Sequence, residues 1–375
     1  MAKTRPAAAN SKKGTRRKPT ASSITLNNVT DEKTLIQKAQ EHISRNEPVD
    51  ALNYALRALE LNPESLAIIE LVAEIHIEIG DVESACHYFS QAAILDPHGA
   101  HESIGGSGPE KFLWLAQLAP AGGLETMQWY EKGAECLREF IKARDQGMHP
   151  DLAERALEKK LVSALCGMAE VYMSDLCMEH DAEARCERYV TEANMVAPDS
   201  AEALQTLASV RISQTRMEDA VAALKRAFLN CAGETYATRI SLARLLIETE
   251  QFEDAVVLLE TLQEEDDTLP DLWYLGGWTL FLLGEREQQK PEKERAENWS
   301  DLWSAARDWL MVCEKNYKLL EWEDEGIRDH ASELLTKITE IIGERIEEED
   351  EEDDEDGEDQ EWESEGDDDE EMKDS

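Results

Sequence analysis

The stretch LIQKAQEHISRNEPVDALNYALRALELNP, residues 35–63, has a counterpart in IIELVAEIHIEIGDVESACHYFSQAAILDP, residues 68–97. The two segments end on Pro63 and Pro97, which are 34 residues apart. Inside the segments, residue types also return at that interval, in the pairs Ala39 and Ala73, His42 and His76, Ala51 and Ala85, and Ala58 and Ala92. A fixed period of this length is typical of a stacked-repeat architecture.

The alanines follow an internal spacing that recurs further along the chain. Ala51 follows Ala39 by twelve positions, and the same interval separates Ala208 from Ala220 and Ala243 from Ala255. Two antiparallel helices approach to about 8–10 Å only where the side chains at their crossing are small. Proline then ends the unit, because it cannot continue a helix. At these positions the chain resembles the tetratricopeptide pattern, in which each unit is a hairpin of two helices.

Other segments deviate from the period but keep a helical pattern. They are a helix, a turn and a helix over 110–145, a pair over 152–198 with a longer loop around 179–182, a pair over 269–320 with a polar insertion, and a last amphipathic helix over 326–345. The sequence therefore predicts an all-α fold, a right-handed tetratricopeptide-repeat solenoid of about seven helical hairpins plus a C-terminal capping helix, disordered at both ends.

Charge divides the chain into three parts. The net charge is -44, to which residues 347–375 contribute -20 and residues 1–20 contribute +7. Acids at the density of the tail repel one another and prevent a packed core. We therefore expect a disordered basic N-terminus over 1–30, the repeat solenoid over 31–346 and a disordered acidic tail over 347–375. The acidic body repels phosphate groups, which predicts no direct nucleic-acid partner and no membrane partner.

Motifs for catalysis or metal binding are missing from the sequence. The eight histidines form no His-Glu-x-x-His motif, and no glycine-rich phosphate loop is present. Cys177, His180 and Cys186 lack the paired spacing of a zinc site.

The seven cysteines form no Cys-x-x-Cys pair and no secretory signal is evident, which favours reduced intracellular thiols. The best apolar run, 272–284, is shorter than the roughly 20 residues that span a bilayer. We expect a protein that is not an enzyme and uses no cofactor.

A binding groove is the remaining candidate site, since the first helix of each unit lines the inner side of such a solenoid. In the second hairpin the groove positions are Glu70, Glu74 and Glu78, which share one helix face. The corresponding positions further along are Glu170, with Asp175 nearby, then Gln205, Ser209 and the basic Arg244, and in the last hairpin the aromatic Tyr274, Trp278 and Phe281. Aromatic rings beside carboxylates suit lysine and arginine, so we expect a basic partner. The alternative is a solvated acidic face with Trp278 in the core.

The two ends carry opposite charge. The motif KKGTRRK predicts a nuclear-import signal and an import receptor as a partner, through Lys12, Lys13, Arg16, Arg17 and Lys18. An uncommitted basic arm and a mitochondrial presequence are the alternatives, but a presequence must form an amphipathic helix, which prolines and a glycine interrupt here. The acidic tail is interpreted as a mobile counter-charge for a basic partner, or as a solubility device.

The basic start, the solenoid beginning LIQKAQEHISRNEPVDALNYALRALELNP, the segments KFLWLAQL and YEKGAECLR, and the acidic tail together resemble the fungal assembly chaperones dedicated to the fourth large-subunit ribosomal protein. The resemblance implies a chaperone without enzymatic activity that holds the long basic internal loop of this client in its concave groove. It also implies escort of the client from the cytoplasm to the nucleus and release onto the pre-ribosome. The alternative is a tetratricopeptide scaffold in a nuclear histone-handling or chromatin complex.

Overall fold

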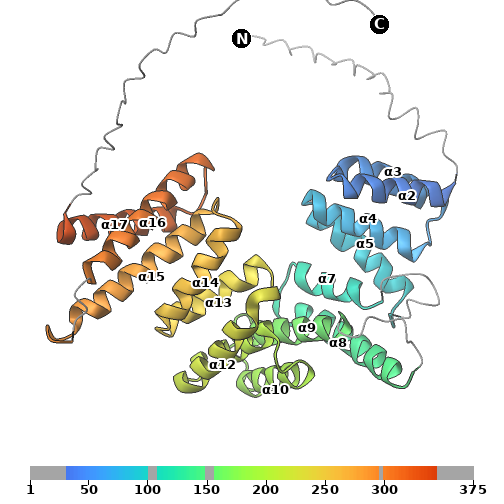
Figure 1. The fold of residues 1–375 in the computed structure, drawn as a ribbon. Helices are drawn as coiled ribbons and strands as arrows, with labels where there is room; N and C mark the ends of the chain where they lie inside the picture. The colour runs from blue at the N-terminus through green and yellow to red at the C-terminus, as the bar shows by residue number, and fades with distance from the viewer. Residues whose placement is uncertain (1–30, 100–107, 148–155, 295–298, 344–375) are drawn as a thin grey trace, which may run out of the picture.

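The structure is a computed structural model that describes residues 31–99, 108–147, 156–294 and 299–343. These residues form fifteen α-helices and one 3-10 turn, and this part of the chain contains no strand. The helices follow one another as antiparallel pairs (Figure 1). The seven pairs are α2 (Glu32–Ser44) with α3 (Pro48–Leu61), α4 (Leu66–Ile79) with α5 (Val82–Leu95), α7 (Glu110–Leu118) with α8 (Gly123–Asp145), α9 (Ala156–Met173) with α10 (Ala182–Val196), α11 (Ala201–Ser213) with α12 (Met217–Asn230), α13 (Tyr236–Glu248) with α14 (Phe252–Glu265), and α15 (Pro270–Gln289) with α16 (Trp299–Leu319), and α17 (Glu325–Ile342) follows them.

The pairs stack into an open arc, with α2 and α3 at one end and α16 and α17 at the other (Figure 1). Within the arc, α9, α11, α13 and α15 contact one another in succession. Neighbouring repeats approach most closely on the concave side of a curved stack, so the first helices of the pairs form its inner layer. We call the solvent-facing side of α2, α4, α7, α9, α11, α13 and α15 the inner surface. The predicted all-α solenoid of about seven hairpins with a capping helix is confirmed.

Local signals explain where the helices begin and end. Asp31 precedes α2, and its carboxylate accepts a hydrogen bond from the backbone N–H of Thr34 at 3.0 Å, which satisfies a free donor of the first turn. Pro48 occupies the first turn of α3, where no backbone N–H is needed. Gly80 ends α4 with a φ of 83°, a left-handed conformation that glycine adopts without strain.

The repeat alanines lie where the helices cross. All of them have 0% exposure, which is the close approach that their spacing predicts, and they are Ala39, Ala51, Ala58, Ala73, Ala85, Ala92, Ala208, Ala220, Ala227, Ala243 and Ala255. The two repeat histidines each stack on a tyrosine of the following helix. The ring centroids lie 5.2 Å apart for His42 and Tyr54 and 5.5 Å apart for His76 and Tyr88. The 34-residue period therefore repeats a packing arrangement as well as residue types.

Glycines let the last pair pack closely. A Cβ atom on Gly276 would lie 2.1 Å from the ring of Trp309, and one on Gly284 would lie 2.3 Å from the ring of Trp303. Real Cβ contacts are essentially never this short, so α15 and α16 can pack this closely only because glycine has no side chain at these two positions. Trp303 is 1% exposed and its indole N–H donates to the carbonyl of Phe281 at 3.0 Å. The last pair therefore packs through tryptophan rings over glycines, whereas the earlier repeats pack through alanines.

Candidate functional site

The acidic row of the second hairpin divides into one buried and two exposed carboxylates. Glu74 and Glu78 are exposed on α4, whereas Glu70 is 3% exposed. Partial desolvation raises the pKa of Glu74, and the nearby carboxylates of Glu70 and Glu110 raise it further. Such a group gains from a cation that arrives beside it. Glu74 and Glu78 are therefore available to a ligand on the inner surface, and Glu70 is enclosed by the protein.

Glu70 belongs to a buried ion-pair network around Lys111. The ammonium group of Lys111 lies 3.5 Å from a carboxylate oxygen of Glu70 and 2.8 Å from one of Asp96. Lys111 also donates to the carbonyl of Gly108 at 2.6 Å, and its side chain has 0% exposure. The network joins α4, the end of α5 and the start of α7. Its charges therefore fix how the second and third hairpins pack.

A hollow of about 300 Å³ opens between α9, α11 and α13, three helices of the inner layer. Its lining includes Glu170 from α9, Gln205 and Ser209 from α11, and Glu202 from the first turn of α11. Leu245 of α13 contributes an apolar wall. The structure thus brings together three residues that repeat numbering assigns to the groove, and adds a second carboxylate to them.

The two carboxylates of this hollow have no ion-pair partner in the described part of the chain. Burial raises the pKa of Glu170, and the proximity of Glu202 adds to the effect. Burial also raises the pKa of Glu202, where Glu234 adds to it and Ser163 and Lys159 act in the opposite direction. Lys159 is itself 3.4 Å from Glu234. In the described part of the chain, neither Glu170 nor Glu202 forms an ion pair with lysine or arginine.

The other predicted groove residues lie in different settings. Asp175 follows α9, and its carboxylate accepts a hydrogen bond from the N–H of Gly123 at 2.8 Å. That contact satisfies a donor at the start of α8, so Asp175 joins the third hairpin to the fourth. Arg244 of α13 pairs with Asp271 of α15 at 2.8 Å. Both residues therefore take part in contacts between hairpins.

The three predicted aromatic residues of α15 differ in how much of their surface is accessible. The Tyr274 hydroxyl lies 2.7 Å from Nδ1 of His330, and the Trp278 ring meets the His330 ring edge-on at 5.7 Å. Both side chains are half-buried against the capping helix α17. Phe281 is 4% exposed and stacks on Trp303 with ring centroids 5.8 Å apart. Tyr274 and Trp278 keep part of their surface accessible, whereas Phe281 is a core residue.

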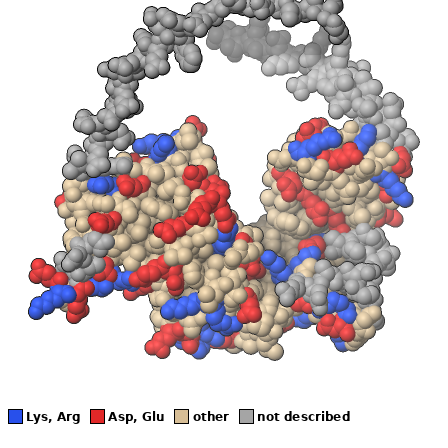
Figure 2. Space-filling view, viewed as in Figure 1, with Lys and Arg blue, Asp and Glu red and all other residues tan. Residues whose placement is uncertain are grey.

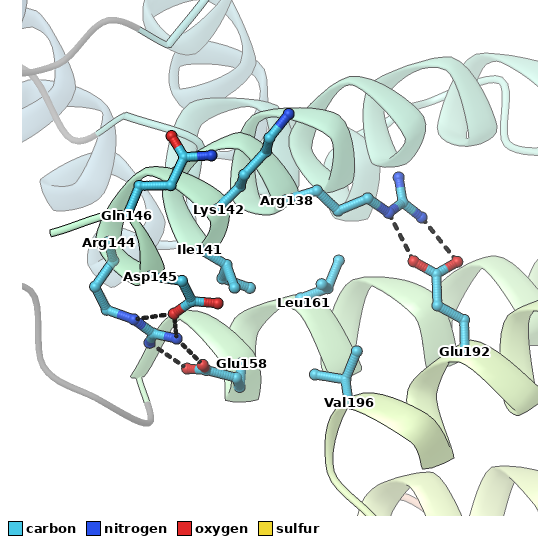
Figure 3. A pocket seen from close by; sticks show the side chains of 10 residues that line it. All are labelled: Arg138, Ile141, Lys142, Arg144, Asp145, Gln146, Glu158, Leu161, Glu192 and Val196. Carbon is cyan, nitrogen blue, oxygen red and sulfur yellow. Dashed lines mark hydrogen bonds and ion pairs between the residues drawn. The ribbon is translucent and has the colours of Figure 1, made fainter. Parts of the chain in front are cut away.

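A second hollow of about 490 Å³ lies between α8, α9 and α10 (Figure 3). Two of its three basic side chains, those of Arg138 and Arg144, are already paired. Arg138 donates to both oxygens of Glu192, at 2.6 and 3.0 Å, and Arg144 pairs with Glu158 and Asp145. These pairs connect α8 to α10 and to α9, as Figure 3 shows. They hold the third and fourth hairpins together, and no residue predicted for the groove lines this hollow.

Metal ligands do not assemble at the cysteine and histidine positions that the sequence singles out. Cys177 and His180 are exposed, whereas Cys186 is buried and directs its thiol to the carbonyl of Ala169 at 3.6 Å. Among the described residues the one group with metal-ligand proximity is His42, Glu47 and Asp50, in which Nδ1 of His42 lies at hydrogen-bond distance, 2.7 Å, from a carboxylate oxygen of Glu47. None of the described helices combines the length and the apolar character that crossing a membrane requires.

Acidic side chains gather where the arc opens. Figure 2 shows Asp and Glu on the sides of both arms that face the opening. The described contributors on the inner layer include Glu74 and Glu78 on one arm and Glu170 and Glu202 toward the middle. The residues of the predicted import signal, Lys12 to Lys18, lie outside the described residues.

Repeat numbering misses two charged residues, the buried Lys111 and Glu202 of the hollow. Lys111 begins the segment KFLWLAQL directly after Glu110, and no local pattern marks it as a buried charge, because its partners Glu70 and Asp96 lie on α4 and at the end of α5. Glu202 lies three positions before Gln205 and therefore on the same helix face, so this spacing could have predicted Glu202 as a groove residue.

Comparisons with known proteins complete the description. No family model matches the chain. The chain is 37% identical over 367 residues to a protein of Emericella nidulans named probable assembly chaperone of rpl4, and the match covers 92% of this chain and 91% of that protein. A protein of Schizosaccharomyces pombe with the same name is 36% identical over 317 residues, which cover 82% of this chain and 90% of the relative. A solved structure of an assembly chaperone of RpL4 (Acl4) has 37% identity and a TM-score of 0.61, over 69% of this chain and 99% of that one.

Proposed function

The chain belongs to the family of the assembly chaperones of rpl4, and we propose that it binds a newly made, highly basic large-subunit ribosomal protein of the rpl4 type along its inner surface. The family relationship supports the choice of client. The chain acts without catalysis and without a cofactor, keeps the client soluble and hands it to the pre-ribosome. The bound segment is an extended basic stretch of the client, such as its internal loop.

The observation that carries this proposal is a set of partly buried carboxylates on the inner surface that form no ion pair with lysine or arginine among the described residues. Glu74, Glu170 and Glu202 each have a raised pKa because the protein partly desolvates them and places other carboxylates nearby. Holding like charges together costs free energy in the empty protein, and a cationic ligand relieves this cost. Charge complementarity of this kind also speeds encounter with a basic partner.

Transport is the second part of the proposal. The motif KKGTRRK engages an import receptor, so the chain moves with its client from the cytoplasm to the nucleus. The acidic sequence of residues 347–371, with twenty acids in twenty-five, supplies a counter-charge that keeps the client from nucleic acid.

Affinity purification of the full chain from translating cells, read by mass spectrometry, tests the proposal. We expect one ribosomal protein of the rpl4 type in stoichiometric amount. Recovery of histones or of a fixed chromatin complex would instead support the scaffold alternative. Recovery of RNA with no basic protein would contradict both.

A further inference from the structure

The hollow between α9, α11 and α13 has the shape and chemistry of a pocket for a single side chain. It is open to solvent on the inner surface and has a volume of about 300 Å³. Met173 and Leu245 supply apolar wall, and Glu170 and Glu202 supply two carboxylates. An apolar wall below a pair of acids matches the long apolar stem and cationic head of lysine or arginine.

A third group in the hollow points to a ligand independently of the acids. Gln205 is 7% exposed, and its side-chain amide nitrogen has no hydrogen-bond partner in the described part of the chain. A buried donor without an acceptor destabilises the empty protein. The donor lines the hollow beside the acids, so an acceptor that enters this hollow would satisfy it.

One kind of ligand satisfies both demands. A metal ion would be attracted by Glu170 and Glu202 but offers no acceptor to the amide N–H of Gln205. A peptide residue with a cationic side chain also has a backbone carbonyl, which accepts a hydrogen bond. The other polar walls, among them Ser209 and Thr238, offer hydroxyl groups that both donate and accept.

We propose that this hollow is a subsite that receives one lysine or arginine residue of the client. The carboxylates of Glu170 and Glu202 pair with the side-chain cation, and the amide of Gln205 donates to the backbone carbonyl of the same or an adjacent client residue. The subsite rests on the proposed function, since the client is the source of the basic residue. Charge attraction alone does not determine which client residue lies at which hairpin. The subsite would fix one such position.

The test measures the affinity of the full chain for the rpl4-type protein of the same organism by titration calorimetry. The double variant Glu170→Gln with Glu202→Gln should weaken binding about tenfold or more, because the client cation would then be desolvated without a charged partner. The matched control removes two exposed acids from the outer helices, Glu218→Gln on α12 with Glu260→Gln on α14, and should change affinity less than about threefold.

Gln205→Leu separates a binding role from a structural one. Because the buried amide donor is unpaired in the empty protein, an apolar side chain of similar size should leave the melting temperature equal or higher while client affinity falls several-fold. A lower melting temperature together with unchanged client affinity would overturn the role of Gln205 in the subsite.

The outcomes distinguish the subsite from the function. If the wild-type chain binds the client and the Glu170 and Glu202 variant binds it equally well, the subsite is overturned and the proposed function stands. If the wild-type chain and the outer-helix control both fail to bind, the proposed function fails and the subsite with it. Saturable binding of Mg²⁺ alone that disappears in the Glu170 and Glu202 variant would also overturn the subsite, as the hollow would then be a metal site.

Discussion

The ammonium group of Lys111 lies 2.8 Å from a carboxylate oxygen of Asp96, and both side chains are at most 3% exposed. Fifteen residues separate them in sequence, and Glu70 joins them from α4 at 3.5 Å. A buried cation between two carboxylates contributes less net stability than its geometry suggests, because all three groups lose their hydration. Loss of the cation, however, would leave two buried anions beside each other.

Lys111→Met should therefore lower the free energy of unfolding by about 3–5 kcal/mol. Urea denaturation followed by circular dichroism measures this change. The matched control is Lys225→Met on α12, where an exposed lysine should contribute less than about 0.5 kcal/mol. Equal stability of the Lys111 variant and the wild type would contradict a structural role for the network.

Reversing the charge of the two exposed acids on α4 should weaken client binding without unfolding the protein. We expect the double variant Glu74→Lys with Glu78→Lys to lose roughly tenfold in affinity, with a weaker dependence on salt because fewer charges attract the client. Titrations across a salt series give both quantities. Glu70→Lys is unsuitable for this purpose, because a second buried cation beside Lys111 would disrupt the fold. Client affinity that stays unchanged at every salt concentration would argue against this part of the surface.

Adding a methyl group at Gly276 should disturb the contact between α15 and α16. The new Cβ atom would lie 2.1 Å from the Trp309 ring, so the ring or the helix must move, and such overpacking costs about 1–3 kcal/mol. Thermal or urea unfolding of Gly276→Ala measures the loss. Gly233→Ala is the control, since its Cβ atom would meet nothing within 4 Å. If both variants unfolded alike, the close packing described here would be incorrect.

The raised pKa values of Glu170 and Glu202 predict a pH dependence of stability with a defined sign. A carboxyl group whose pKa is higher in the folded than in the unfolded state stabilises the fold when protonated and loses that contribution as pH rises through the folded pKa. The free energy of unfolding of the client-free chain should therefore increase as pH falls from 7 toward the ordinary value of 4.5.

The double variant Glu170→Gln with Glu202→Gln isolates this effect, because all other acids of the chain are unchanged in it. Its stability should depend less on pH over the same interval than that of the wild type. Identical pH profiles for the two proteins would show that the pair does not titrate differently in the folded state. Below the ordinary carboxyl value the opposite trend sets in, since pairs such as Glu187 with Arg211 have a lowered carboxyl pKa and lose stability on protonation.

The import signal can be tested apart from client binding. Alanine at Lys12, Lys13, Arg16, Arg17 and Lys18 should abolish nuclear accumulation of the chain and leave the affinity for the client within about twofold, since these residues precede α2, the first of the described helices, in sequence. Alanine at Lys3 and Arg5, which lie outside the cluster, is the control and should leave accumulation intact. Fluorescence microscopy of tagged variants measures accumulation. Undiminished nuclear signal in the first variant would assign import to another segment or to the client.

The solenoid could be predicted from the sequence because its determinants are local and repeat. Small residues at Ala39, Ala51 and Ala58 return in later units, and each lies fully buried at a helix crossing. Repeat numbering also assigned Glu170 and Gln205 to the inner side, since side chains at equivalent positions face the same side of a regular stack. Both residues line the hollow between α9, α11 and α13.

The same numbering failed to separate exposed from buried positions. Glu70 occupies a groove position but is buried, because it pairs with Lys111, which lies 41 positions later on α7, and no local pattern predicts that pair. Phe281 is enclosed for a related reason, since the glycines of α15 admit Trp303 so closely that the ring of Phe281 has a partner on α16. Contacts between distant segments decide these cases, and periodicity carries no information about them.

The arc in Figure 1 is built from interfaces between consecutive hairpins, and its two arms face each other across an opening. In such a chain of interfaces, small rotations at each step add up, so the width of the opening adjusts to what lies in it at little cost per step. A long segment held there need not detach all at once, because contacts at one hairpin can be exchanged while those at the next persist. A competing binding site that engages one end of the segment would therefore have to break the contacts of only one hairpin at a time. This architecture therefore allows a long segment to be held tightly and still be transferred rapidly.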